Sequence, residues 1–351
     1  MCISRLKTFG LILLAAALVG GEVFASETIN RKREKALSGE VTGVSKTEVT
    51  IKVKTPKEET IKVPANDVSS IDWTGQPAET KMAFSDENGG RFQRAIDEYQ
   101  KALASNKASN PLLKVDLEFD IARVMAKIAL ADPSKSDEAI EKLDKFRKSQ
   151  GDHYRYYDAV RLLAELYTAK RDAVKARVAI DTLARAPWKD YQSAAKIASA
   201  RLFLTENKFD EAAGEYESVI NAPAEGAAEE AQRQEAILGR TRVLIGQKKY
   251  DDAIKLLDEI IAKAPADEVK LNAEAFLRRG DCLREQGNDQ DAVLEYLKVD
   301  VLFASDKPAH AEALFRLAEL WGKVGRKERA DEARDRLKIE YEGSEWAREL
   351  K

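Results

Sequence analysis

The sequence predicts a mainly α-helical protein, a solenoid of helical hairpins preceded by a small β-sheet domain. Three observations support this fold class. Apolar and polar residues alternate with a period of two over residues 37–73, and from about residue 79 the apolar residues recur at helical spacing. The helical part also repeats itself, with an alanine returning every 36 to 44 residues. The chain of 351 residues is long enough for such an array.

The first 25 residues have the pattern of a secretory signal peptide. Arg5 and Lys7 give a basic start, an apolar run follows over 9–21, and small residues precede a cleavage position after Ala25. The alternative is an uncleaved membrane anchor, but the run is short for the ~30 Å hydrocarbon layer of a bilayer. We therefore expect an exported protein, in the periplasm or cell envelope, whose mature chain has no transmembrane span.

Residues 26–36 are polar and charged, which predicts a short linker. Four basic residues gather there: Arg31, Lys32, Arg33 and Lys35. Such a cluster could touch anionic lipid, although four charges beside two glutamates are more typical of a solvated tail.

Residues 37–75 are predicted to form a small β domain. The segments 48–54 and 60–63 alternate β-branched and charged residues, and Pro56 and Pro64 mark turns. Four or five short strands in so few residues indicate a small curled sheet or a partial SH3- or Sm-like barrel. Its core would be small, so we expect it to lean on the helical part or on a partner. Sm-like folds can bind RNA, but the net charge of −3 and the lack of a basic, aromatic face argue against a nucleic-acid partner.

Residues 79–351 are predicted to form the solenoid, in about six or seven units. Prolines and glycines divide the segment into helices, because a helix does not pass easily through proline. One alanine opens the second helix of each unit: Ala95, Ala139, Ala176, Ala212, Ala253, Ala292 and Ala330.

Over this segment the chain resembles the tetratricopeptide repeat family, in the form found in exported bacterial proteins. In one unit the large, small, aromatic and turn positions of the family motif are taken by Phe276, Gly280, Leu283, Gly287, Ala292 and Tyr296. The resemblance covers residues 79–342 and is strongest over 190–342. It implies that hairpins stack through small and large residues, with Gly280 and Tyr296 among them, and that the protein binds a protein or peptide.

The resemblance also implies that the first helix of each hairpin lines a concave groove. Projecting the repeat frame places these residues there: Arg161, Arg201, Leu238, Arg242, Leu277, Arg284 and Phe315. Arg201 and Arg242 take the same repeat position, so an acidic group of a peptide is one expected ligand. The alternative is a concave face that is merely solvated.

No catalytic, metal or cofactor motif is found in the sequence. The two histidines, His153 and His310, fall in different units, and Cys282 lies in a helical pattern as a small apolar residue would. The densest aromatic group, residues 153–157, is either a partner contact or a filler between repeats.

These observations favour a non-enzymatic exported scaffold for protein–protein interaction. The first alternative is a cell-envelope assembly factor associated with peptidoglycan or the outer membrane. The second, an enzyme with an unrecognised site, has no constellation of residues behind it.

Overall fold

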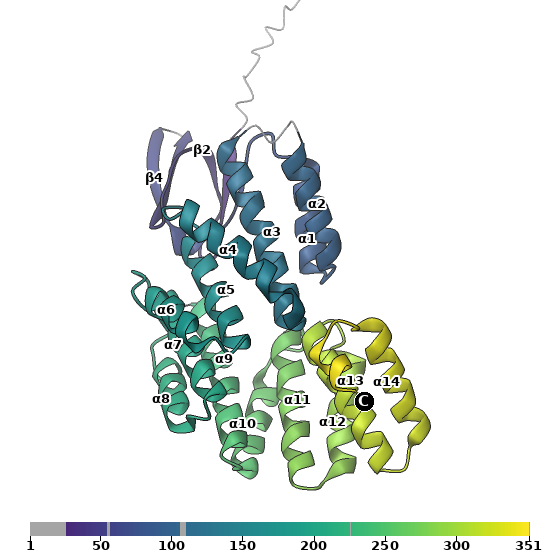
Figure 1. The fold of residues 1–351 in the computed structure, drawn as a ribbon. Coiled ribbons are helices and arrows are strands. Elements are labelled where there is room, and N and C mark those ends of the chain that lie inside the picture. The colour runs from purple at the N-terminus through teal and green to yellow at the C-terminus, as the bar shows by residue number, and fades with distance from the viewer. Residues whose placement is uncertain (1–25, 55–56, 106–109, 225, 351) are drawn as a thin grey trace, which may run out of the picture.

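The computed structural model describes residues 26–54, 57–105, 110–224 and 226–350. The predicted signal peptide, residues 1–25, lies outside the described residues. A five-stranded antiparallel sheet is followed by a long array of helices, as predicted (Figure 1).

The sheet has the strand order β4-β3-β2-β1-β5. Four strands follow one another as a meander, and a 3-10 turn at Ala65–Asp67 then returns the chain so that β5 pairs with β1. The alternating pattern is confirmed on the inward face, where Val49, Ile51 and Val63 are fully buried. The strands are β1 (Glu27–Arg31), β2 (Leu37–Val44), β3 (Glu48–Lys54), β4 (Glu58–Pro64) and β5 (Val68–Asp72).

The prediction of a linker over residues 26–36 was wrong, because this segment contains β1. Ile29 is its one buried residue, and it pairs with Leu37 of β2 on one side and with Ile71 of β5 on the other. The strand forms through these distant partners and not through its own, mostly polar sequence.

The basic cluster in this segment is pinned to the sheet and is not a free tail. The Nε of Arg31 donates to Asp67 Oδ2 at 2.7 Å, and the Nζ of Lys32 donates to the carbonyl oxygen of Asn66 at 2.9 Å. Asp67 and Asn66 are themselves buried. Most of the positive charge predicted for a solvated or lipid-facing tail is thus paired within the protein.

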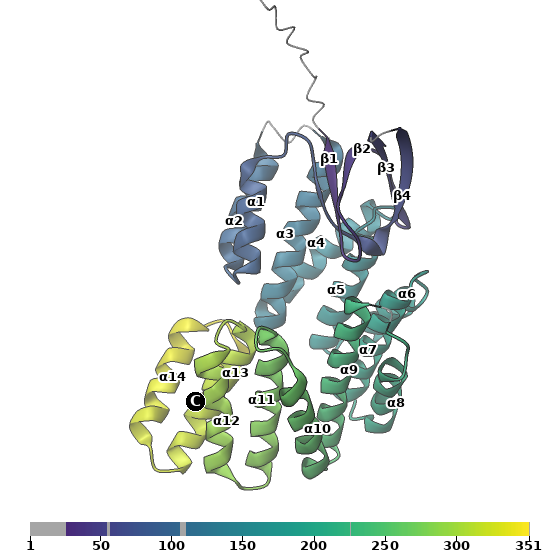
Figure 2. The ribbon, with the colours of Figure 1, turned by 180° about the vertical axis from the view of Figure 1, so that it is seen from behind.

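Consecutive helices pair as antiparallel hairpins, in which an odd-numbered helix comes first and the next, even-numbered helix second (Figures 1 and 2). In the described residues α1 to α14 make seven such hairpins, and α15 follows the last. The helices are α1 (Ala78–Asn88), α2 (Phe92–Ala104), α3 (Pro111–Ala131), α4 (Ser136–Ser149), α5 (Tyr156–Ala169), α6 (Ala173–Ala184), α7 (Lys189–Thr205), α8 (Phe209–Ile220), α9 (Ala227–Gly246), α10 (Tyr250–Lys263), α11 (Val269–Glu285), α12 (Asp289–Leu302), α13 (Lys307–Lys323), α14 (Lys327–Glu340) and α15 (Glu345–Glu349).

Small residues allow the helices of each hairpin to approach closely. The seven repeated alanines lie on the second helices and are at most 3% exposed. At Gly280 of α11, an added Cβ would lie 2.6 Å from Cε1 of Tyr296 on α12, so the tyrosine ring occupies the space that a side chain would need. Between successive hairpins, Gly239 of α9 meets Tyr216 of α8 in the same way, with an added Cβ 2.2 Å from the ring. The repeat is thus built from a glycine on one helix and a ring on its neighbour.

The sheet packs against the first helices through one buried joint. Trp73, just after β5, donates from its indole nitrogen to Asp116 Oδ2 on α3 at 2.6 Å. Tyr154 is 1% exposed and packs in the same core, beside His153. Nη2 of Arg155 donates to the carbonyl oxygen of Ser69 on β5 at 2.6 Å. Much of the aromatic group at residues 153–157 is therefore a filler in this joint and not an exposed partner contact.

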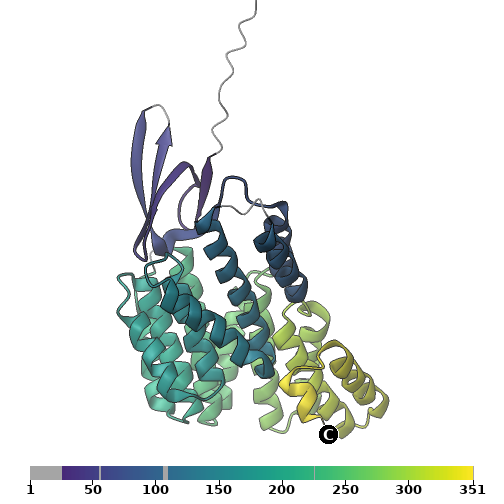
Figure 3. The ribbon, with the colours of Figure 1, turned by 45° about the horizontal axis from the view of Figure 1, so that its top comes forward.

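The helical array curves so that its C-terminal end returns toward α3. The yellow end of the chain lies beside the lower end of α3 in both Figure 1 and Figure 3. Arg348 of α15 lies 3.8 Å from Asp132, the residue that follows α3. The curve leaves the first helices of successive hairpins, among them α7, α9 and α11, next to one another.

Candidate concave binding site

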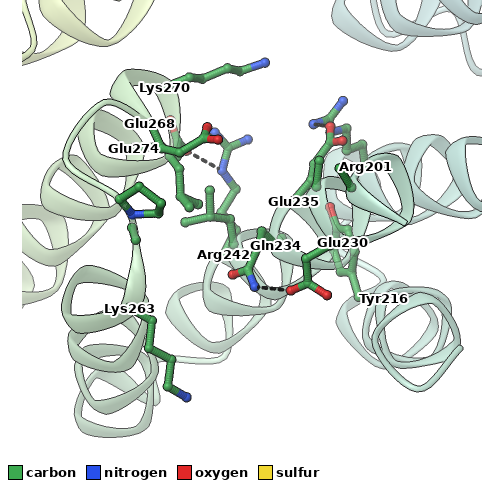
Figure 4. Close-up of a pocket in the computed structure, with 17 residues that line it drawn as sticks. Arg201, Tyr216, Glu230, Gln234, Glu235, Arg242, Lys263, Glu268, Lys270 and Glu274 are labelled. Atoms are coloured by element: carbon green, nitrogen blue, oxygen red, sulfur yellow. Dashed lines mark hydrogen bonds and ion pairs between the residues drawn. The ribbon is translucent and has the colours of Figure 1, made fainter. Parts of the chain in front are cut away.

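A cavity of about 610 Å³ lies where α7, α9 and α11 meet. These are the first helices of three successive hairpins, and residues 263–265, at the end of α10, close one side. Figure 4 shows the polar side chains standing around this cavity. It brings together three of the residues predicted for the groove: Arg201, Leu238 and Arg242.

The cavity combines an apolar lining with a balanced set of charges. Leu238, Leu271 and Pro265 supply apolar surface, together with alanines and the ring of Tyr216. The charged residues around it are four basic and four acidic: Arg201, Arg242, Lys263, Lys270, Glu230, Glu235, Glu268 and Glu274. An apolar pocket with a few convergent polar groups is the usual form of a ligand site in a protein.

Arginine and glutamate residues form a ladder across the concave face. Nη2 of Arg201 on α7 donates to Oε1 of Glu235 on α9 at 2.5 Å. Arg242 on α9 makes the equivalent pair with Glu274 on α11. Arg278 on α11 continues the series by pairing with Glu312 on α13. Each arginine thus reaches the first helix of the next hairpin. The two stacked arginines predicted to bind an acidic ligand, Arg201 and Arg242, are already paired with glutamates of the protein.

The electrostatics of the ladder favour the charged form of both partners. Burial disfavours the carboxylate of Glu274, but Arg242 and Arg278 outweigh that effect and lower its pKa to about 2. Burial also disfavours the guanidinium of Arg201, whose pKa is nevertheless raised, chiefly by Glu235 and Glu165. Glu274 and Arg201 therefore stay ionised at neutral pH.

Two further predicted groove residues lie on the same series of helices but outside the cavity. Nη1 of Arg161 on α5 donates to Glu165 of its own helix at 2.8 Å. Nη2 of Arg284 on α11 donates to Glu285 at 2.8 Å, and its Nη1 lies 3.9 Å from Glu319 on α13.

Leu277 and Phe315 do not line the groove, and their assignment to it was wrong. Leu277 is fully buried in the core shared by α11, α12 and α13. Phe315 is 6% exposed, because the ring of Trp346 on α15 packs over it with centroids 5.2 Å apart. Leu277 faces the next hairpin and Phe315 faces α15. The projection of a single helix does not separate these sides from the groove.

Sequence reasoning missed the glutamates of the ladder, although a signal was present. The three arginine–glutamate pairs join residues separated by 34, 32 and 34 positions, somewhat fewer than the 38 to 41 residues between the repeated alanines of these hairpins. Each acid lies one or two helical turns before the position equivalent to its arginine in the next repeat, and this spacing joins adjacent first helices.

The histidine and cysteine side chains that could have suggested chemistry make structural contacts instead. His310 is 2% exposed and contacts Tyr341 Oη at 2.6 Å through Nδ1 and Asp300 Oδ1 at 2.8 Å through Nε2, which ties α13 to its neighbours. Cys282 is fully buried, and burial raises the pKa of its thiol to about 12. Among the described residues no group of three or more His, Cys, Asp or Glu is placed to hold a metal ion. None of the described helices has the length and apolar character needed to cross a bilayer.

The fold and this site define the class of the protein: an α-solenoid of tetratricopeptide-like hairpins with a concave cavity. The family model of the tetratricopeptide repeat matches residues 238–301, which run from the middle of α9 into α12. That match includes Leu238 and Arg242 of the cavity.

Similar proteins are found both by sequence and by structure. DnaJ homolog subfamily C member 3 of Gallus gallus is 26% identical over 177 residues, which are 48% of this chain and 33% of that protein. The chain thus spans about a third of the length of this relative. A tetratricopeptide repeat protein from Parabacteroides merdae is similar in structure, with a TM-score of 0.49 and 16% identity, over 74% of this chain and 91% of that one. A Rap protein complexed with competence and sporulation factor is similar with a TM-score of 0.47 and 17% identity, over 76% and 75% of the two chains. The pilus biogenesis factor PilW has a TM-score of 0.44 and 16% identity, over 68% and 98%.

Proposed function

We propose that this protein is a non-enzymatic scaffold that binds a segment of a partner protein in the cavity between α7, α9 and α11. The cavity itself carries the proposal, because it joins apolar surface to polar groups at the concave face of a repeat array. The tetratricopeptide repeat match over residues 238–301 supports the same proposal, since that match contains ten of the seventeen residues that line the cavity.

The lining defines the chemistry of the partner. Arg201 and Arg242 are neutralised by Glu235 and Glu274, so a strongly acidic peptide gains little from them. The binding segment is instead one with a large apolar side chain that enters beside Leu238. Charged groups of both signs on that segment would face the rim, where charge sets specificity and association rate more than affinity.

The site of action we propose is outside the cytoplasm. The basic, apolar and small-residue pattern of residues 1–25 supports export, with a mature chain that begins at Ser26. Cell fractionation with N-terminal sequencing of the recovered protein tests this: a chain that still begins at Met1 in the cytoplasm contradicts it.

The binding proposal is tested by affinity capture with matched variants. Leu238→Asp places a carboxylate in the apolar lining, and Val178→Asp makes the same change at a residue of α6 that is 62% exposed and outside the cavity. Proteins captured by the wild type and by V178D, but lost from L238D, are the expected partners. If L238D is folded by circular dichroism and retains every partner, the cavity is not the binding site.

A further inference from the structure

The β unit reaches past its neighbouring helices to the first turns of α7 and α9. Nη2 of Arg33, two residues after β1, donates to Oε1 of Glu229 on α9 at 2.7 Å and lies 3.5 Å from Oδ2 of Asp190 on α7. Asn66, between β4 and β5, donates from Nδ2 to the same Asp190 oxygen at 3.0 Å. In Figure 3 the sheet stands over the ends of the teal helices in this part of the array.

Hydrogen bonds to Asp67 hold the backbone at Arg33 in place against the sheet. Its backbone nitrogen donates to Oδ1 of Asp67 at 2.9 Å, and the backbone nitrogen of Lys32 donates to the carbonyl oxygen of the same residue at 2.8 Å. Asp67 is 4% exposed and belongs to the 3-10 turn before β5. The backbone of Arg33 is therefore anchored to the core of the sheet, and its side chain, which is 40% exposed, extends from there to α7 and α9.

The turn of α9 that Arg33 holds continues directly into the cavity wall. Glu229 is followed by Glu230 and Ala231, which line the cavity. Gln232 lies one turn further along, and its Nε2 donates to the carbonyl oxygen of Asp190 at 2.7 Å, so α9 is tied to α7 at the same level. The sheet, the start of α7 and the start of α9 thus meet in one hydrogen-bonded cluster at the edge of the site.

We propose that Arg33 is a positioning residue for the concave site: through Glu229 it holds the first turns of α9 and so shapes one wall of the cavity. The β unit is then a brace for the binding surface and not a separate adaptor. Its consequence for partner binding rests on the proposed function, but the ordering of α9 does not.

Hydrogen exchange of the full mature chain tests the proposal without any partner. Arg33→Glu faces Glu229 and Asp190 with a like charge, and amides 231–236 of α9 are expected to exchange roughly two- to five-fold faster, as for loss of one partly exposed ion pair. The double variant Arg33→Glu with Glu229→Arg restores opposite charges, and exchange should return toward the wild-type rate.

Arg177→Glu is the matched control, because Arg177 makes a 2.6 Å ion pair of similar exposure with Glu206, away from α9. It should leave amides 231–236 unchanged. The proposal is overturned if R33E and R177E give the same exchange there, or if the double variant does not recover. This result is distinct from failure of the proposed function, in which α9 responds to R33E as expected but L238D loses no partner.

Discussion

The guanidinium of Arg201 on α7 lies 2.5 Å from the carboxylate of Glu235 on α9, so the two helices are joined across the concave face. The pairing recurs one hairpin later between Arg242 and Glu274. A surface of this kind presents fixed charges of both signs beside apolar side chains. Under the proposed function, such a surface selects a partner by the arrangement of charge and by one apolar anchor, and not by net charge.

The ladder is expected to contribute little to stability at its exposed rungs. The side chains of Arg201 and Glu235 are 35% and 40% exposed. A double-mutant cycle with Arg201→Ala and Glu235→Ala should give a coupling free energy of about 0.2–1 kcal/mol by urea unfolding. The coupling should shrink in 1 M salt, because exposed charges are screened. A coupling that salt does not change would contradict this account.

Two glycines in the repeat should respond to alanine in opposite directions. At Gly280 a new Cβ would collide with the ring of Tyr296, so Gly280→Ala should lower the free energy of unfolding by about 1–3 kcal/mol. Gly214 of α8 has open space at that position, so Gly214→Ala should raise it by roughly 0.5–1 kcal/mol through better helix propensity. Urea unfolding of both variants measures the two changes in the free energy of unfolding. Equal changes would mean that the contact between Gly280 and the ring of Tyr296 does not determine the packing.

The contribution of Asp116 to the joint between sheet and helices should weaken as pH rises. Burial raises the pKa of Asp116 from its usual 3.8 to about 7, despite the opposing charge of Arg155 and the hydrogen bond from Trp73. When folding raises the pKa of a carboxyl group, the protonated form stabilises the folded state and the ionised form does so less. Its contribution is therefore lost as pH rises from about 4 to about 7, and it stays lost above that.

Asp116→Asn isolates this contribution, because the amide keeps the shape and does not titrate. The melting temperature of the wild type minus that of D116N should fall between pH 5 and pH 8, with Trp73 fluorescence reporting on the joint. A difference that stays constant over this range would show that Asp116 does not titrate there.

The last hairpin should depend on Trp346. Its ring covers Phe315, so Trp346→Ala should cost about 1–3 kcal/mol and speed hydrogen exchange mainly in α13, since a solenoid is stabilised by contacts between neighbours. Ile339→Ala is the control, because Ile339 is 81% exposed and should change stability by less than about 0.5 kcal/mol. Similar losses for the two variants would contradict a capping role of the tryptophan.

Periodicity was enough to predict a small sheet followed by a series of helical hairpins. Each hairpin is specified by its local pattern and by one alanine such as Ala292. Periodicity was not enough for β1, whose residues around Ile29 become a strand by pairing with Leu37, eight positions away, and with Ile71, 42 positions away. The brace formed by Arg33 is equally non-local, since it joins residues 196 positions apart.

The site was predicted in part. Arg201 and Arg242 lie around one cavity because they take the same repeat position on adjacent first helices, and Leu238 lies one turn before Arg242 on α9. Leu277 and Phe315 share that frame, yet contacts with the next helices cover them. A frame read along one helix gives the direction of a side chain, and only the packing of its neighbours decides whether the side chain remains exposed.

Site-specific photo-crosslinking tests the central claim most directly. A benzophenone amino acid replaces Leu238 in the cavity, and in a second variant it replaces Val178 on α6. After irradiation of the exported fraction, mass spectrometry should find a partner peptide attached at position 238 and not at 178, and the added Arg242→Glu substitution should reduce its yield. If position 238 gives no adduct while 178 does, the partner binds elsewhere on the solenoid and the account of the concave cavity is wrong.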